Sequence, residues 1–283
     1  MFSWRCIMRI VADSSCDLYT LDYPDFQTVP LKIYTDERSF TDDTSLNIKD
    51  MLDYLAGYRG RSYTSCPSVE DWLNAYEGAE EIFVSTVTSS LSGSYNSAMT
   101  AAGIYQEDHP EAKISVIDSL STGAEEIMLL YKLKELISAG GSFESIDQSI
   151  RDYLKSTRLF FSFFSLHNLA QNGRVNKAAS AALCVLNISV TGTASEAGKI
   201  SVTGKARGER KSVKTLFQDM QKAGYSGGRA VITHVENEEM AISLRNTIRE
   251  NYPEADIHIL PARGLCSYYM ERRGVVVSCE TQN

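Results

Sequence analysis

The sequence has little of what a membrane protein or a metalloprotein requires. No stretch of its 283 residues approaches the roughly 20 consecutive apolar residues of a membrane span, so we expect no integral membrane segment. Its four histidines form no pair with zinc-ligand spacing, and its six cysteines include no Cys-x-x-Cys pair. We therefore expect reduced thiols and no metal site.

Positive charge is also scarce. The 28 Lys and Arg residues are outnumbered by 36 Asp and Glu residues, which gives a net charge of −8. The most basic stretch, Lys205–Lys214, is interrupted by Glu209, so we expect no nucleic-acid partner. Residues 1–8 are too short and too mixed for a signal peptide, and we therefore expect a cytoplasmic protein.

The length of the chain predicts two domains, since a single core rarely exceeds about 150–200 residues. In the first half, predicted strands alternate with helices, which indicates an α/β domain with a doubly wound, mostly parallel sheet. The second half has the pattern of an α+β domain. We expect the domains to cover 1–156 and 157–283. The strands predicted for the first half are 8–12, 29–34, 81–85 and 113–118, and the helices include 45–56, 119–137 and 143–157.

The second half opens with an aromatic strand, 159–166. Its run Phe160–Phe164 has aromatic residues on both faces, which favours core packing, although such a strand could also wall a cavity. A strand pair forming a hairpin-type edge is predicted at 199–203 and 204–207. The other predictions are helices at 178–186, 211–223 and 238–251 and strands at 229–234, 256–260 and 275–279.

A hydroxyl-rich turn follows the strand predicted at 81–85. Seven Ser and Thr residues lie between Ser85 and Ser94, together with Gly93. Such a turn between a strand and a helix offers backbone N–H groups and hydroxyl donors to an anionic group. The alternative is that the hydroxyls only cap a helix and fill a tight turn. Asp13, at the end of another strand, has the same two interpretations: a helix cap or a polar residue of a site.

Three chemistries could use this turn. A nucleophilic serine needs a neighbouring base, but Ser90–Gly93 does not match Gly-x-Ser-x-Gly. A nucleotide phosphate loop would need a glycine pattern that the turn lacks. The third is a carboxylate site, in which neutral hydroxyls bind the anion.

Six segments occur in the order and with roughly the gaps of one family. Through them the chain resembles the DegV family of bacterial fatty-acid-binding proteins. The segments are Ile10–Leu18, Val29–Leu31, Thr64–Ser68, Ser89–Tyr95, Ile117–Ser119 and Gly173–Val175.

The resemblance implies a carrier with no catalytic turnover and no cofactor. It would bind one long-chain fatty acid between its two domains and present the carboxylate to a separate fatty-acid kinase, which forms an acyl phosphate. Carried over by motif, Thr64, Ser65 and Ser92 would hold the carboxylate, Gly93 would let the backbone approach it, and Arg174 would add a positive charge.

The chain departs from the family near its end. The family has Gly-Thr-His-x-Gly-Pro-Gly, with the His near the carboxylate, whereas Gly264–Met270 has no His and would place Cys266 in the site. Two alternatives therefore stay open. One is an acyl-hydrolase or acyltransferase that uses Ser92 or Cys266, and the other is a carrier of a different amphiphilic carboxylate.

Overall fold

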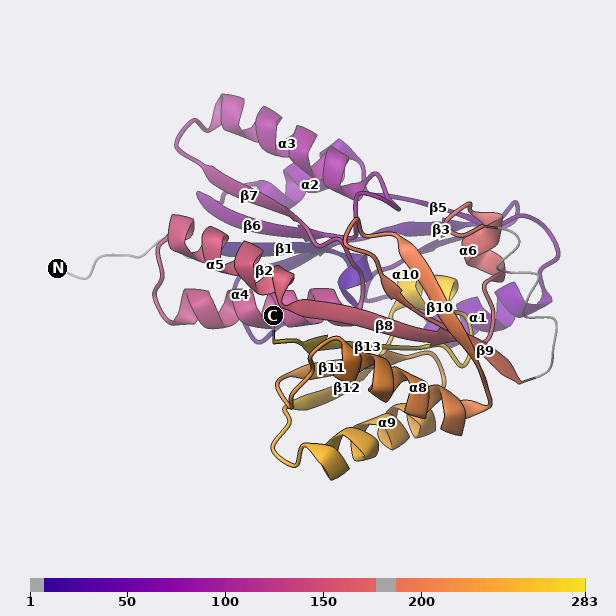
Figure 1. Ribbon diagram of the computed structural model, residues 1–283. Coiled ribbons are helices and arrows are strands. Elements are labelled where there is room, and N and C mark those ends of the chain that lie inside the picture. Colours follow the sequence, from indigo (N-terminus) through magenta and orange to yellow (C-terminus); the bar gives the residue numbers. More distant parts are fainter. Residues whose placement is uncertain (1–7, 177–186, 283) are drawn as a thin grey trace.

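The first half of the chain forms a parallel sheet, as predicted. The computed structural model describes residues 8–176 and 187–282 (Figure 1). The sheet has the order β2-β1-β6-β7, and every neighbouring pair is parallel. Ala12 pairs with Ser85, so the carboxyl ends of β1 and β6 lie side by side. The strands are β1 Arg9–Asp13, β2 Phe26–Val29, β6 Glu81–Thr86 and β7 Lys113–Asp118.

Helices cover both faces of this sheet, which confirms the doubly wound α/β architecture. On one face, the side chains of Val11 and Val84 pack with Trp72 and Tyr76 in a shared core. That face is covered by α2 (Val69–Tyr76) and α3 (Ser94–Asp108), and the other by α4 (Ala124–Ser138) and α5 (Phe143–Lys155).

The strand predicted at 29–34 is wrong as a single element. The chain leaves the parallel sheet after Val29 and joins a second sheet at β3. Pro30 lies at the break, and it has no N–H to continue a ladder. The N–H of the next residue, Leu31, donates instead to Ser14 Oγ (3.0 Å). The second sheet, of order β4-β3-β5, is antiparallel and consists of β3 Lys32–Tyr34, β4 Ser39–Thr41 and β5 Tyr63–Ser65.

The second half forms a six-stranded mixed sheet, which confirms the α+β prediction. Its order is β10-β9-β8-β13-β11-β12, with only β11 and β12 parallel. Helices α8 (Glu209–Lys222) and α9 (Glu238–Asn251) cover one face. The strands are β8 Thr157–Phe163, β9 Ile188–Ala194, β10 Ile200–Arg207, β11 Ala230–His234, β12 Ile257–Pro261 and β13 Val275–Glu280.

The predicted hairpin within 199–207 is also wrong. Residues 200–207 form one strand, β10, with a bulge between Val202 and Gly204, and the hairpin partner is β9. Gly204 therefore marks a bulge where the sequence suggested a turn. Strand β9 was not predicted. Its Gly192 packs against the Phe161 ring, which leaves no room for a Cβ.

Helix α4 lies between the two large sheets (Figure 1). Its residues Ile127, Met128 and Leu130 belong to one core that also contains Ile10 of β1 and Val276 of β13. The predicted start of this helix at Ser119 is wrong. Residues 119–123 form a turn in which Leu120 and Gly123 have positive φ, and the helix begins at Ala124.

Four short elements complete the described fold. The predicted helix 178–186 lies outside the described residues. The division at residue 156 stays a prediction, although β8 begins at Thr157. Within the described ranges, no helix is long and apolar enough to cross a membrane. The short elements are the 3-10 turn η1 Ser14–Cys16 and the helices α1 Ile48–Gly57, α6 His167–Gln171 and α10 Gly264–Met270.

Candidate functional site

A cavity of about 300 Å³ lies between the two large sheets. The first half of the chain contributes its hydroxyl-rich segments, which we call the polar wall. The second half contributes aliphatic and aromatic side chains, which we call the apolar wall. The polar wall consists of Thr64, Ser65, Ser92, Gly93, Ser121 and Thr122. The apolar wall consists of Leu159, Phe161, Phe163, Leu169, Ile200 and Val276.

All six residues that the sequence placed in a site line this one cavity. Four belong to the polar wall, and Arg174 and Cys266 come from the second half of the chain. Sequence reasoning missed Lys199 and Tyr269, which line the cavity as well. Arg174 and Lys199 are the only charged residues among the lining residues that the structure describes, and both are cations.

The turn that carries Ser92 is held from behind by two carboxylates, the buried Asp13 and the partly exposed Asp118. Asp13 Oδ2 accepts hydrogen bonds from the Val87 N–H (3.0 Å) and from the Ser94 hydroxyl. Asp118 Oδ1 accepts from the Ser89 N–H (3.0 Å). Asp13 also caps η1 through its other oxygen, which confirms the helix-cap interpretation of this residue. It supports the site without lining the cavity.

Ser92 and Gly93 lie at the N-terminus of α3, where free backbone N–H groups favour an anion. Gly93 is the N-cap of α3 and offers no capping side chain, and the Ser92 hydroxyl accepts from the Ser94 N–H (3.2 Å). A Cβ on Gly93 would lie 3.2 Å from Cys66 Sγ, so the lack of a side chain lets the two turns of the polar wall meet.

Thr64 reaches the cavity from the end of β5, and its hydroxyl lies 2.7 Å from the Tyr269 hydroxyl. Burial raises the pKa of Tyr269, so its phenol stays protonated at neutral pH. When Tyr269 donates to Thr64, the Thr64 proton is free to point into the cavity. In that arrangement Tyr269 orients the Thr64 hydroxyl, one of the predicted donors.

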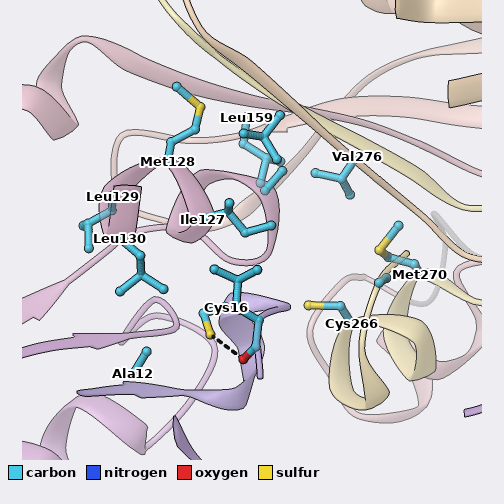
Figure 2. Close-up of a cluster of buried hydrophobic side chains, with 14 of the residues drawn as sticks. Ala12, Cys16, Ile127, Met128, Leu129, Leu130, Leu159, Cys266, Met270 and Val276 are labelled. Carbon is cyan, nitrogen blue, oxygen red and sulfur yellow. Dashed lines mark hydrogen bonds between the residues drawn. The ribbon is translucent and has the colours of Figure 1, made fainter. Parts of the chain in front are cut away.

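Cys266 is buried in α10, and its thiol donates to the Ser15 carbonyl (3.3 Å). Its Sγ also lies 3.6 Å from Thr122 Oγ1. Burial, followed by the charge of Asp17, raises its pKa well above the usual value. Figure 2 shows Cys266 and Met270 on α10, beside Val276 of the apolar wall. A thiol in this setting is a weak donor and a poor nucleophile.

Gly123 closes the polar wall beside Asp17. Its φ of +54° favours glycine, and a Cβ there would lie 3.1 Å from Asp17 Oδ2. Asp17 Oδ1 accepts from the Arg263 N–H (2.7 Å), whereas Oδ2 has no hydrogen-bond partner within the described structure. Burial raises the pKa of Asp17 to about 7.

Residues 8–176 and 187–282 contain no group of three or more His, Cys, Asp or Glu side chains that could hold a metal ion. No histidine, aspartate or glutamate lines the described part of the cavity. The cavity combines neutral hydroxyl donors and two cations with an apolar wall. Such a lining suits an amphiphilic anion.

The fold and this cavity define an α/β protein with an amphiphilic cavity between its two large sheets. The DegV family model matches residues 8–280, and the chain belongs to the DegV family. A DegV domain-containing protein of Streptococcus pneumoniae serotype 4 is 44% identical over 276 residues, which are 96% of this chain and 98% of that protein. A relative from Streptococcus gordonii is 40% identical over 276 residues, with the same shares covered.

Solved structures of the family are similar along nearly the whole chain. A DegV family protein from Eubacterium eligens, loaded with heptadecanoic acid, has a TM-score of 0.95 and 49% identity and covers 97% of this chain and 100% of its own. The Streptococcus pneumoniae Fatty Acid Kinase (Fak) B3 protein, loaded with linoleic acid, has a TM-score of 0.95 and 44% identity, with 97% and 99% covered.

Proposed function

We propose that the protein binds one long-chain fatty acid in this cavity, with the carboxylate against the polar wall and the acyl chain along the apolar wall. The observation that carries the proposal is the pairing of hydroxyl donors and two cations with an apolar space that has no lining acid among the described residues. A carboxylate removed from water needs several hydrogen bonds, and these groups can supply them.

Each predicted residue has a part in this proposal. Thr64, Ser65 and Ser92 donate hydrogen bonds to the carboxylate, and Gly93 lets backbone N–H groups approach it. Arg174 supplies positive charge. Cys266 stays a neutral thiol beside Thr122 and makes a smaller contribution than an imidazole would.

The two loaded neighbours support the ligand class, because both carry straight-chain fatty acids and share the fold over nearly their whole length. One of them is named for a fatty acid kinase. We therefore also propose that this chain is a carrier without turnover of its own and presents the carboxylate to a separate kinase. Such a role places the protein in the cytoplasm, where a kinase finds its ATP.

The hydrolase alternative has less support. A nucleophilic Ser92 needs a base, and no histidine lines the described cavity. Cys266 has a raised pKa, and its thiol contacts the Ser15 carbonyl and the Thr122 hydroxyl, neither of which is an activating cation. A carrier of another amphiphilic carboxylate would use the same walls, so the identity of the ligand has to be measured.

Native mass spectrometry of the purified protein, followed by denaturation and lipid analysis, tests the proposal. We expect about one fatty acid per chain, because each buried methylene contributes roughly 0.8 kcal/mol. Several preparations without a stoichiometric acyl chain would contradict the carrier role. A different amphiphilic carboxylate in the extract would support the carrier of another ligand.

A further inference from the structure

The Ser15 hydroxyl lies between two fully buried carboxyl groups. Its Oγ is 2.5 Å from Asp13 Oδ1 and 2.5 Å from Glu126 Oε1. Asp13 ends β1 and Glu126 belongs to the first turn of α4, and both are 0% exposed. Cys16 and Ile127, the residues that follow Ser15 and Glu126, lie in the same buried cluster (Figure 2).

The hydrogens around Ser15 can be counted. Each of the two short contacts needs a hydrogen, but a serine hydroxyl has only one. The other polar contacts of the pair do not supply the second, because Ser85 donates to Glu126 Oε2 (3.0 Å) and Ser94 donates to Asp13 Oδ2. The second hydrogen must therefore be a carboxyl proton.

The surroundings show which carboxyl carries it. Asp13 accepts from two backbone N–H groups, those of Ser15 (3.1 Å) and Val87 (3.0 Å), and a backbone N–H can only donate. Glu126 faces only hydroxyls, which can either donate or accept. We propose that Glu126 keeps its proton and donates it to Ser15, while Ser15 donates to an ionised Asp13, so that Glu126 is a neutral positioning residue for the Ser92 turn.

The electrostatics agree with this assignment. Burial raises the pKa of both carboxyls, and the charge of Asp13 raises that of Glu126 further. Asp17 raises the pKa of Glu126 as well, whereas the contacts with the Ser15 and Ser85 hydroxyls lower it. In the described structure, no ion pair joins either carboxyl to a Lys or Arg side chain.

The network matters because it ends on the polar wall. Asp13 contacts Val87 and Ser94, which flank Ser92 and Gly93. With Glu126 neutral, one buried negative charge lies behind this turn, where two would repel a bound carboxylate. This consequence for the ligand rests on the proposed function, whereas the protonation of Glu126 does not.

Substitutions separate the two carboxyls. In Glu126→Gln the amide can donate to Ser15 and its oxygen can accept from Ser85, as the protonated acid does. In Asp13→Asn an amide NH₂ has to face one of two backbone N–H groups. For octadecanoate binding, we expect a loss of tenfold or more in Glu126→Ala, rescue to within threefold of wild type in Glu126→Gln, and a larger loss in Asp13→Asn than in Glu126→Gln. The reverse order, with Asp13→Asn tolerated and Glu126→Gln impaired, would overturn the assignment.

Infrared spectroscopy of the protein without added ligand gives a second test that needs no binding. At pH 8 we expect the wild-type minus Glu126→Gln difference spectrum to contain the carbonyl stretch of a protonated carboxyl. A difference spectrum with only carboxylate bands would refute a neutral Glu126. If wild type does not bind octadecanoate but the protonated band is present, the proposed function fails and the proton assignment stands.

Discussion

The polar and apolar walls of the cavity are built by different means. The polar wall consists of turns after strands and of part of β5, held in place by individual hydrogen bonds that Asp13 and Asp118 accept and by the contact between Thr64 and Tyr269. The apolar wall consists of side chains on paired strands, where the alternation of β8 directs Phe161 toward the cavity and Phe160 toward α8 and α9. Binding at the polar wall therefore depends on individual hydrogen-bond donors, whereas binding at the apolar wall depends on the volume of the packed side chains.

The largest effect is expected on the apolar wall, from Phe161→Ala. The ring is 2% exposed and stacks on Phe163 with centroids 4.5 Å apart. Its loss should lower the free energy of unfolding by about 3–5 kcal/mol, measured by urea denaturation. It should also shift binding toward longer or bulkier acyl chains. Phe160→Ala is the control, because it should destabilise similarly without changing chain preference. Equal chain preferences in the two variants would contradict the division of the walls.

Asp17 behind the polar wall should make stability depend on pH. Its pKa is raised to about 7, so the folded state holds a proton that the unfolded chain releases at about pH 4. Its contribution to the free energy of unfolding is therefore complete below about pH 4 and is lost as the pH rises through 7. The total loss is roughly 3–5 kcal/mol.

Urea denaturation of wild type and Asp17→Asn at a series of pH values checks this dependence. Asn keeps the acceptor for the Arg263 N–H but does not titrate. The stability of the variant should therefore fall less than that of wild type as the pH rises from 4 to 8. Parallel stability curves for the two proteins from pH 4 to 8 would show that Asp17 titrates normally.

Single donors of the polar wall should matter for binding more than for stability. Ser92→Ala and Thr64→Val each remove a hydrogen bond to a charged group, which is worth on the order of 1.5–3 kcal/mol, or about 10- to 150-fold in affinity. Unlike Phe161→Ala, they should weaken all chain lengths equally. Ser89→Ala, an exposed serine of the same turn that lies outside the cavity lining, is the matched control. Losses below threefold in both variants would exclude these hydroxyls as ligands.

The smallest effect is expected from Lys199→Gln. Lys199 is exposed, so its attraction to a carboxylate should be worth roughly two- to fivefold in affinity at low ionic strength and vanish in high salt. Titrations at two salt concentrations measure this, with Lys205→Gln on the adjoining strand β10 as control. A loss that persists in high salt would mean that Lys199 contacts the ligand directly.

The parts of the site that were predictable lie in local sequence. Thr64 lies in the short strand β5 and Ser92 in the turn that follows β6, and both belong to short hydroxyl-rich segments of the sequence. The parallel sheet followed from the alternation of strands and helices. These features depend on residues close together in the chain, so the sequence alone could indicate them.

The remaining features depend on residues that are distant in the chain. Tyr269 contacts Thr64 across more than 200 positions, and Glu126 contacts Ser15 across 111. Lys199 lines the cavity only because the β9–β10 hairpin folds over the turn that carries Ser90, whose hydroxyl donates to the Ala197 carbonyl. No local pattern predicts such pairings. The division of the predicted strand 29–34 at Pro30 also depends on distant residues, because β2 and β3 pair with strands of different sheets.

Helix α4 also limits how anything can enter or leave the cavity. Residues 127–130 and Leu133 are 0% exposed because a sheet covers each side of the helix. Moving the sheets apart as rigid bodies would expose these side chains to water, at a cost on the order of 10 kcal/mol. Exchange of a ligand on a biological timescale therefore has to proceed through a smaller displacement at the rim, with the α4 core intact.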